Sequence, residues 1–209
     1  MLIVLECIDR SGKSTQCRML KEALEELGYR VKYYRYPDRT LPHTGAVVNE
    51  YLAKTIDMSP NAASLLLASV LWAQQDTLRL EDDNTIVLMD RHVWSNIAYS
   101  VTRGMDESVM RRISKGLQDP DLILFIDAPP ELAARRGDFG KERFDRIEFQ
   151  ASVASIMRRL SEESTTPVFR LDASLDPSHI SRTILATVLS LVASKSLIAK
   201  EQGWPSASK

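Results

Sequence analysis

The stretch that most constrains the fold lies at residues 2–15, LIVLECIDRSGKST. Its apolar beginning predicts a short buried strand, and the Gly-Lys-Ser-Thr at its end opens a helical pattern. A strand, a short polar loop and a helix that begins with Gly-Lys-Ser are the context of a phosphate-binding P-loop. In such a loop the backbone N–H groups point at phosphate oxygens, and the helix N-terminus adds about half a positive charge.

The polar side chains of this loop suit a nucleotide polyphosphate. Lys13 can reach the β- and γ-phosphates, and the Ser14 hydroxyl can bind magnesium. Cys7 departs from the motif, because it stands where the first glycine is expected. A Cβ resists positive φ and narrows the approach to phosphate, so we expect the loop to survive if φ at Cys7 is negative. A strand-to-helix turn with a chance Gly-Lys-Ser is the alternative.

Composition limits the class of protein. A chain of 209 residues with 44% hydrophobic residues suits one α/β domain with a sizeable core. The net charge of −1 gives no reason to expect a nucleic acid or a membrane surface as partner. The uncharged stretches near 62–75 and 183–194 are shorter than the roughly 20 residues of a membrane span. Only two cysteines, Cys7 and Cys17, are present, which fits a reducing, cytoplasmic setting.

Segments typical of strands and helices alternate along the rest of the chain. β-rich runs predict four further strands, at 31–36, 85–89, 122–126 and 168–171. Helical spacing predicts helices at 13–28, 44–54, 59–81, 95–102, 106–117, 145–163 and 176–200, with another starting at 131–136. This alternation predicts an α/β fold, a doubly wound five-stranded parallel sheet with helices on both faces.

Two of these helices carry more specific predictions. In the first helix, the spacing places Cys17, Leu20, Leu24 and Leu27 along one apolar face. The helix at 59–81 is apolar nearly all round over residues 65–72, so we expect it to be buried.

Charged residues follow several of the predicted strands. Ligands of open parallel sheets bind at the carboxyl ends of strands, so Arg39 is a candidate anion clamp, with a solvated loop arginine as the alternative. Asp90 suits magnesium or its water shell, and Arg91 suits the phosphates of donor and acceptor. A helix cap or a structural pair with Arg91 is the alternative for Asp90. We expect His92 to line the same pocket.

Two further segments complete the predicted site. Residues 172–174 follow the last strand, where a nucleotide base can rest against the backbone. A basic stretch with two glycines at about 136–144 favours a lid that closes over phosphates, rather than an ordinary solvated loop. We therefore expect a single domain over residues 1–200, with 201–209 as a loose tail.

An ordered set of motifs runs through the chain: LECIDRSGKSTQ, YPDR, LLLASVLW, MDRHVWSNIAY, PDLILFIDAPPELAARRG, FGKERF with FQ soon after, and LDAS. On these motifs the chain resembles the thymidylate kinases, P-loop enzymes that pass a phosphoryl group from ATP to dTMP. The likeness runs from residue 2 to about 174. It implies a nucleoside monophosphate kinase fold, ATP as donor with Mg2+, a pyrimidine deoxynucleotide as acceptor, and a homodimer.

The resemblance also implies roles for individual residues. The implied catalytic residues are Lys13, Arg10, Asp90, Arg91 and Arg143. The implied ATP-binding residues are Arg10, Ser11, Gly12, Lys13, Ser14, Thr15 and Arg136. The implied acceptor-binding residues are Asp9, Tyr36, Arg39, Leu67, Leu71, Arg91, Ser95, Tyr99 and Phe144. The implied metal ligands are Ser14 and Asp90.

Two leucines depart from the family pattern in the thymine pocket. Leu67 stands where a phenylalanine normally stacks on thymine, and Leu71 where an arginine normally binds a thymine carbonyl. Loss of the stacking ring costs about 1 kcal/mol, and loss of a charged hydrogen bond a further ~1.5–3 kcal/mol. Two alternatives to dTMP phosphorylation therefore stay open: the same chemistry on another pyrimidine nucleotide, or nucleotide binding without turnover.

Overall fold

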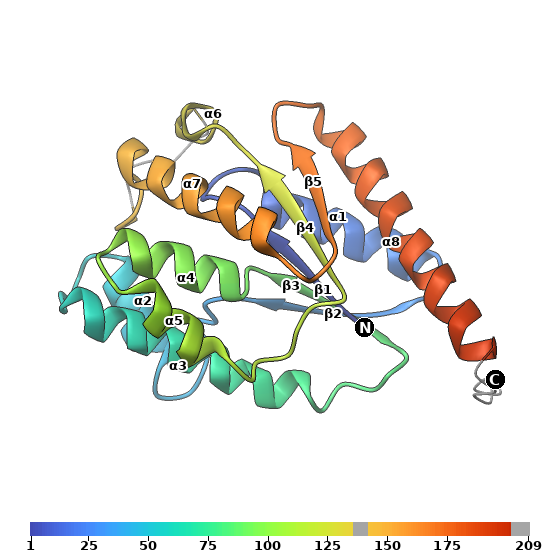
Figure 1. The fold of residues 1–209 in the computed structure, drawn as a ribbon, viewed down its shortest axis with the longest axis horizontal. Helices are drawn as coiled ribbons and strands as arrows, with labels where there is room; N and C mark the ends of the chain where they lie inside the picture. Colours follow the sequence, from blue (N-terminus) through green and yellow to red (C-terminus); the bar gives the residue numbers. More distant parts are fainter. Residues whose placement is uncertain (136–141, 202–209) are drawn as a thin grey trace.

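The computed structural model describes residues 1–135 and 142–201. A five-stranded sheet lies at its centre, with the strand order β2-β3-β1-β4-β5 (Figure 1). The strands are β1 (Leu2–Glu6), β2 (Arg30–Arg35), β3 (Thr85–Asp90), β4 (Leu122–Asp127) and β5 (Val168–Asp172). Every pairing is parallel, so the predicted doubly wound parallel sheet is confirmed.

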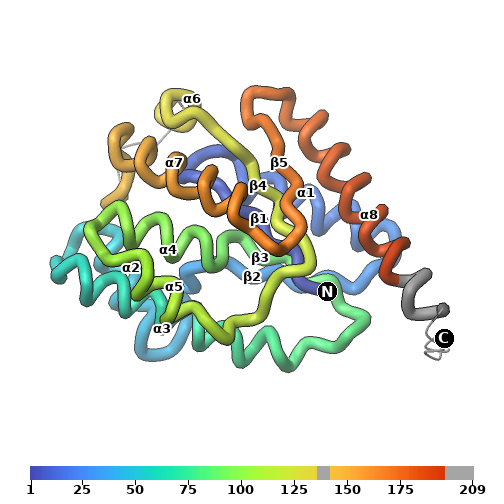
Figure 2. Tube along the Cα trace, viewed as in Figure 1, coloured from blue at the N-terminus to red at the C-terminus, as the bar shows by residue number. Residues whose placement is uncertain are grey.

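The helices form a layer on each side of this sheet. They are α1 (Lys13–Glu26), α2 (Gly45–Leu52), α3 (Pro60–Leu78), α4 (Val93–Thr102), α5 (Glu107–Ser114), α6 (Pro130–Ala134), α7 (Ile147–Glu163) and α8 (Pro177–Glu201). Helix α8 lies beside α1, and α4 packs against α3, α5 and α7, as the tube in Figure 2 also shows. Right-handed crossovers explain the two layers, because β1 connects toward one edge of the sheet and the later strands connect toward the other.

The strand order places the site at the carboxyl end of β1. The chain leaves β1 into α1, whereas it leaves the neighbouring strands β3 and β4 into helices of the opposite layer. Loops that diverge in this way open a crevice at the end of the sheet. The strands beneath it are a packed core, since every residue of β1 and β3 is buried.

Two predictions about the helices differ from the structure. The helix predicted over 13–28 is shorter, because α1 ends at Glu26, and Leu27, its C-cap, is 56% exposed rather than part of the apolar face. The helix predicted over 59–81 is not buried all round, because Leu65 on α3 is 50% exposed. Trp72 on the same helix is partly buried, and its Nε1 donates to the carbonyl of Ile113 at 2.8 Å.

In the part of the chain that the structure describes, none of the helices is long and apolar enough to cross a membrane. Residues 202–209 of the tail predicted at 201–209, and residues 136–141 of the lid predicted at about 136–144, Arg136 among them, lie outside the described residues. Glu201 is the last residue of α8.

Candidate functional site

The loop between β1 and α1 accommodates Cys7 without backbone strain. Its left-handed conformations fall on Arg10 (φ 60°) and Gly12 (φ 97°), and Cys7 is not among the described residues with positive φ. The condition predicted for a functional loop is therefore met. Burial raises the pKa of the Cys7 thiol, which makes the side chain inert filling rather than a nucleophile.

Lys13, at the start of α1, forms a buried ion pair with Asp90 at the end of β3. The Asp90 carboxylate also accepts hydrogen bonds from the Ser14 hydroxyl at 2.7 Å and the Tyr33 hydroxyl at 3.0 Å. Burial alone would raise the pKa of Asp90, but Lys13, Arg91 and Ser14 outweigh it and the pKa is lowered. The structure therefore holds an ionised carboxylate beside a lysine and a hydroxyl at the loop.

Arg91, the next residue, is buried and links the loop to α4. Its Nη1 donates to the Cys7 carbonyl at 2.7 Å and to the Ser95 hydroxyl at 2.9 Å, and its Nη2 donates to Asp9 at 2.6 Å. The guanidinium carbon lies 5.2 Å from the centre of the Tyr99 ring. A φ of 73° at Arg91 is unfavourable for a side chain with a Cβ, and these contacts hold the residue there.

Gln150 on α7 holds Asp9 from the other side. Its Nε2 donates to the Asp9 carboxylate at 2.8 Å, and its Oε1 accepts from the Asp9 backbone N–H at 3.1 Å. Burial alone would raise the pKa of Asp9, but Arg91, Tyr99 and Gln150 together lower it. Sequence reasoning assigned no role to Gln150, whose only signal was its place in the FQ of the matched motif.

Glu6 at the end of β1 is a second residue that sequence reasoning missed. Its carboxyl accepts from the backbone N–H groups of His92 (2.9 Å) and Ser95 (3.2 Å) and from the Ser95 hydroxyl. Burial raises the pKa of Glu6 despite these bonds. Because Ser95 in turn accepts from Arg91, Glu6 fixes Arg91 through Ser95. A carboxylate that ends an otherwise apolar strand was the available signal.

A cavity at this end of the sheet, named here the Arg91 cavity, gathers most residues predicted to bind the acceptor. The predicted residues that line it are Asp9, Tyr36, Arg39, Leu67, Arg91, Ser95, Tyr99 and Phe144. The residues that line it without having been predicted are Arg35, Pro37, Leu52, Asn96, Arg103 and Glu142. Leu71 is not brought there, because its side chain is fully buried in the core.

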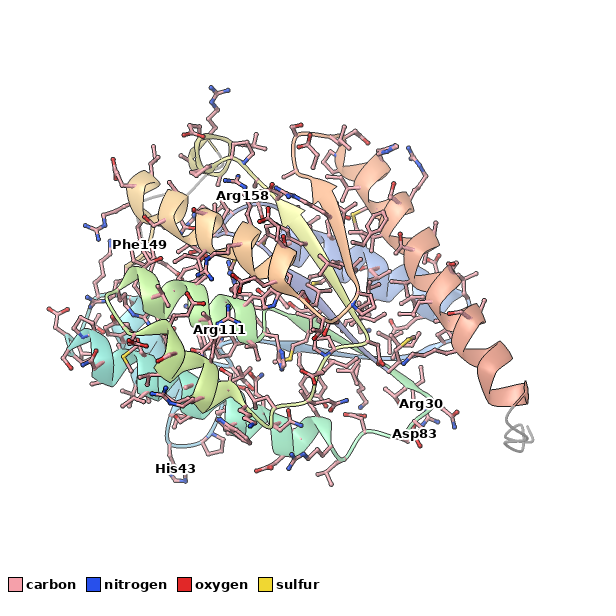
Figure 3. The ribbon with its side chains drawn as sticks, in the orientation of Figure 1. Arg30, His43, Asp83, Arg111, Phe149 and Arg158 are labelled. Carbon is pink, nitrogen blue, oxygen red and sulfur yellow. The ribbon has the colours of Figure 1, made fainter. Side chains whose placement is uncertain are left out.

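Aromatic rings close one side of the Arg91 cavity. The Phe144 ring stacks on Phe149, with the centroids 4.9 Å apart and the planes 14° apart. Phe149 is labelled on α7 in Figure 3. Tyr99 contacts Phe144 edge-on at 5.6 Å. Phe144 thus belongs to a packed cluster in which Tyr99 is also fixed.

The other predicted cations of the site have protein partners. Arg10 donates to Asp145 at 3.0 Å, and Arg39 to Glu142 at 2.8 Å. Arg143 is turned toward the C-terminal end of α2 and the segment that follows it, where it donates to the carbonyls of Tyr51 and Ile56, both at 2.7 Å. The structure does not bring Arg143 into the Arg91 cavity.

A second cavity, of about 230 Å³, lies on the other side of the loop and is named here the Ala173 cavity. Ser11, Gly12 and Thr15 form its loop side, and Ala173 forms part of its far wall. This is the position predicted for a nucleotide base beyond β5. One loop therefore borders both cavities, with Asp9 lining one and Ser11, Gly12 and Thr15 lining the other.

Known proteins with similar sequences now place the chain in a family. The family model described as thymidylate kinase matches residues 5–184. The chain belongs to the thymidylate kinase family. The thymidylate kinase of Arabidopsis thaliana is 35% identical over 173 residues, which are 82% of this chain and 65% of that protein. The human thymidylate kinase is 33% identical over 175 residues, covering 83% of this chain and 82% of the human protein.

A solved structure agrees with the sequence comparison. The thymidylate kinase of Candida albicans superposes with a TM-score of 0.72 at 26% identity, and the match covers 93% of this chain and 92% of that one. The P-loop nucleoside monophosphate kinase fold expected from the sequence is therefore confirmed. The predicted resemblance to thymidylate kinases is confirmed as well, since the chain belongs to that family.

Within this thymidylate kinase fold, His92 lies elsewhere than expected. Its ring lines a separate cavity of about 480 Å³ bordered by α4, α5 and α7, and it does not line the Arg91 cavity. The reason is that Arg91 turns inward to the loop, so the next side chain faces the opposite side of α4. Burial lowers the pKa of His92 to about 4.

This shifted pKa predicts a pH dependence of stability. An ordinary histidine has a pKa near 6.5. Between that pH and about 4, His92 therefore binds a proton in the unfolded chain but not in the folded chain. Between pH 7 and pH 5 this group should cost about 2 kcal/mol of unfolding free energy. Urea unfolding of the parent and of His92→Gln at both pH values measures this change in unfolding free energy. Glu6, whose pKa is raised, changes the unfolding free energy in the opposite direction, but it does so in both proteins and therefore cancels in the comparison. His43 is exposed, so His43→Gln should lose as much unfolding free energy between pH 7 and pH 5 as the parent does. The same loss in all three proteins would contradict the prediction.

Proposed function

We propose that this protein transfers the γ-phosphoryl group of ATP to dTMP and produces dTDP. The observation that carries this proposal is the pair of cavities on either side of one phosphate-binding loop. Membership of the thymidylate kinase family supports it, as does the name that the Arabidopsis and human relatives share. ATP would occupy the Ala173 cavity and the loop, and dTMP the Arg91 cavity.

On the donor side, Lys13 and residues 11–15 would bind the ATP phosphates. Lys13 now pairs with Asp90, so nucleotide binding would exchange that partner for phosphate oxygens. Magnesium fits Ser14 and Asp90, because Mg2+ in such sites takes one or two protein oxygens besides phosphates and waters. The ion would neutralise phosphate charge. Arg10, and Arg136 beyond the described residues, would add cations near ATP.

On the acceptor side, Arg39 and Arg91 would hold the dTMP phosphate opposite the loop. Asp9 and Gln150 keep Arg91 in place, and Tyr99 would pack against the sugar, where its ring leaves little room for a 2′-hydroxyl. Phosphoryl transfer needs positioned reactants and cations around the transferred group more than it needs a base. Arg143 would reach that group only if it left its present carbonyl partners.

A second candidate function is the same transfer to another pyrimidine nucleotide. Leu67 gives the Arg91 cavity an aliphatic wall, and Leu71 is sealed in the core. The thymidylate kinase of Candida albicans, whose structure is similar, is described as having broad substrate specificity. A third possibility, binding without turnover, is opposed by the complete set of Lys13, Asp90 and Arg91 contacts.

Coupled ADP release with ATP and magnesium tests these alternatives. The acceptors are dTMP, dUMP, dCMP, UMP, CMP, dGMP and dAMP, and we expect the highest kcat/KM with dTMP. A higher kcat/KM with another pyrimidine would select the second candidate function. ATP binding without ADP release for any acceptor would contradict the kinase activity.

Three coarser features belong to the same proposal. We place the activity in a single domain over residues 1–200, in the cytoplasm, without nucleic acid or membrane partners. We also propose a homodimer, as the resemblance to thymidylate kinases implies, with α3, which exposes Leu65, as a candidate interface. Light scattering of the parent and Leu65→Asp would test the dimer.

A further inference from the structure

Arg103, at the C-terminal end of α4, reaches into the Arg91 cavity without a charged partner. Its Nη2 donates to the hydroxyls of Ser64 at 2.9 Å and Ser100 at 3.0 Å. Both partners are neutral, and no carboxylate of the described chain pairs with this guanidinium. Two other cavity arginines have carboxylate partners, since Arg39 is paired with Glu142 and Arg91 with Asp9. Arg35 also lines the cavity, but it is exposed to solvent, whereas Arg103 is not.

Two of the three guanidinium nitrogens of Arg103 donate no hydrogen bond to the described residues. Nε and Nη1 are buried and have no hydrogen-bond partner among the described residues. The guanidinium carbon lies 5.1 Å from the centre of the Phe144 ring, which keeps the group against an apolar wall. Buried donors without partners are rare because each costs free energy. An acceptor atom on a bound ligand would remove that cost.

The position along α4 indicates which part of the ligand Arg103 meets. Ser95, Tyr99 and Arg103 line the cavity at steps of four residues, so they mark successive turns of one helix face. Ser95 contacts Arg91 next to the phosphate-binding loop. Arg103 lies about 12 Å farther along the helix, at 1.5 Å per residue. A nucleotide whose phosphate lies at Arg91 would therefore present its base to Arg103.

We propose that Arg103 is a specificity-determining residue that donates a hydrogen bond to the 4-oxo group of the acceptor base. A guanidinium only donates. Thymine and uracil carry an oxygen acceptor at position 4, whereas cytosine carries an amino donor there. Arg103 would therefore select 4-oxo pyrimidines and reject cytosine. The inference rests on the proposed acceptor site and names the base chemistry that the site reads.

A second residue of the cavity wall, Asn96, supports the same inference. The Nδ2 of Asn96 is also buried without a partner in the described part of the chain, while its Oδ1 accepts from the Tyr36 hydroxyl at 3.0 Å. The cavity wall thus offers spare donors and no spare acceptor from these two residues. An acceptor-rich base edge fits this wall better than a donor-rich one.

Equilibrium binding of dTMP, dUMP and dCMP to the parent and to Arg103→Met tests the inference. We expect the Kd for dTMP and for dUMP to rise about tenfold or more, and the Kd for dCMP to change less than threefold. The ratio between dTMP and dUMP should stay constant, because both carry the 4-oxo group. Arg79→Met, an exposed arginine outside the cavity, is the matched control and should leave all three values unchanged.

Equal losses for all three nucleotides would overturn the inference, since they would assign Arg103 to the phosphate or to the cavity's integrity. Unchanged values would also overturn it. Arg103→Gln gives a second readout, because an amide can accept as well as donate, and its preference should shift toward dCMP. This variant also serves if Arg103→Met does not fold.

The experiment separates a failure of the proposed kinase activity from a failure of the proposed role of Arg103. A parent that binds dTMP but releases no ADP contradicts the proposed kinase activity and leaves the base preference measurable. A parent that binds dCMP as tightly as dTMP overturns the role of Arg103, whatever its turnover.

Discussion

Replacement of Lys13 by alanine is expected to lower kcat about a thousandfold. A loss of that size corresponds to about 4 kcal/mol of transition-state stabilisation, which a lysine on the transferred phosphoryl supplies in a site that works by electrostatics. The structure places Lys13 at the first turn of α1 beside Asp90, where the loop, the helix N-terminus and the carboxylate meet. Steady-state turnover with saturating ATP, magnesium and dTMP measures the effect.

The same substitution also changes the protein's stability. Without Lys13, the Asp90 carboxylate stays buried and loses its ion-pair partner, and it keeps the hydrogen bonds from the Ser14 and Tyr33 hydroxyls. Removing one member of a buried pair costs about 3–5 kcal/mol, so thermal unfolding must accompany the kinetics. Lys21→Ala is the matched control on the same helix, since Lys21 lies outside both cavities and is partly exposed, and its ion-pair partner among the described residues is Glu25. A folded Lys13→Ala protein within threefold of the parent would remove Lys13 from the mechanism.

The residues that sequence reasoning placed correctly are those fixed by local patterns. Lys13 and Ser14 follow a strand and open a helix, and Asp90 ends a buried strand. In a parallel sheet these positions meet at one edge whatever the details of packing. The fold and the central cluster could therefore be predicted from the order of strands, loops and helices alone.

The residues that it missed depend on packing between distant segments. Gln150 contacts Asp9 across 141 residues of chain, and Glu6 contacts Ser95 across 89. The local signals, a carboxylate at the end of an apolar strand for Glu6 and the FQ of a matched motif for Gln150, do not reveal which distant residues these side chains contact. Arg103 marks a helix end in the sequence, and its place in the cavity follows from the direction of α4 across the sheet.

Two predicted positions show the limit of carrying over a motif. Leu67 and Leu71 lie one turn apart on α3, yet only Leu67 lines the Arg91 cavity. Leu71 is sealed in the core because an aliphatic side chain there gains more from packing than from the pocket. Arg143 belongs to the matched FGKERF motif, but its guanidinium is satisfied by the carbonyls of Tyr51 and Ile56.

Arg91→Lys is expected to lower kcat/KM for dTMP by a factor of about 100 to 1,000, with the KM for ATP changed less than threefold. One guanidinium here binds Cys7, Ser95 and Asp9 at once. A lysine keeps the charge but offers a compact ammonium, so it cannot hold these partners and a phosphate in one plane. A loss of two to three orders of magnitude corresponds to about 3–4 kcal/mol in the transition state.

The left-handed backbone at Arg91 should make the loss of kcat/KM in Arg91→Lys larger than the loss of a single hydrogen bond would. A φ of 73° costs about 1–3 kcal/mol for a residue with a Cβ, and the three side-chain bonds of Arg91 hold it there. With lysine, the residue would relax toward ordinary φ and carry Asp90 and the start of α4 away from the loop. Arg18→Lys, an exposed arginine paired with Glu22 on α1, controls for the substitution itself. An Arg91→Lys protein that retains more than a third of the parent's kcat/KM would show that charge alone suffices at this position.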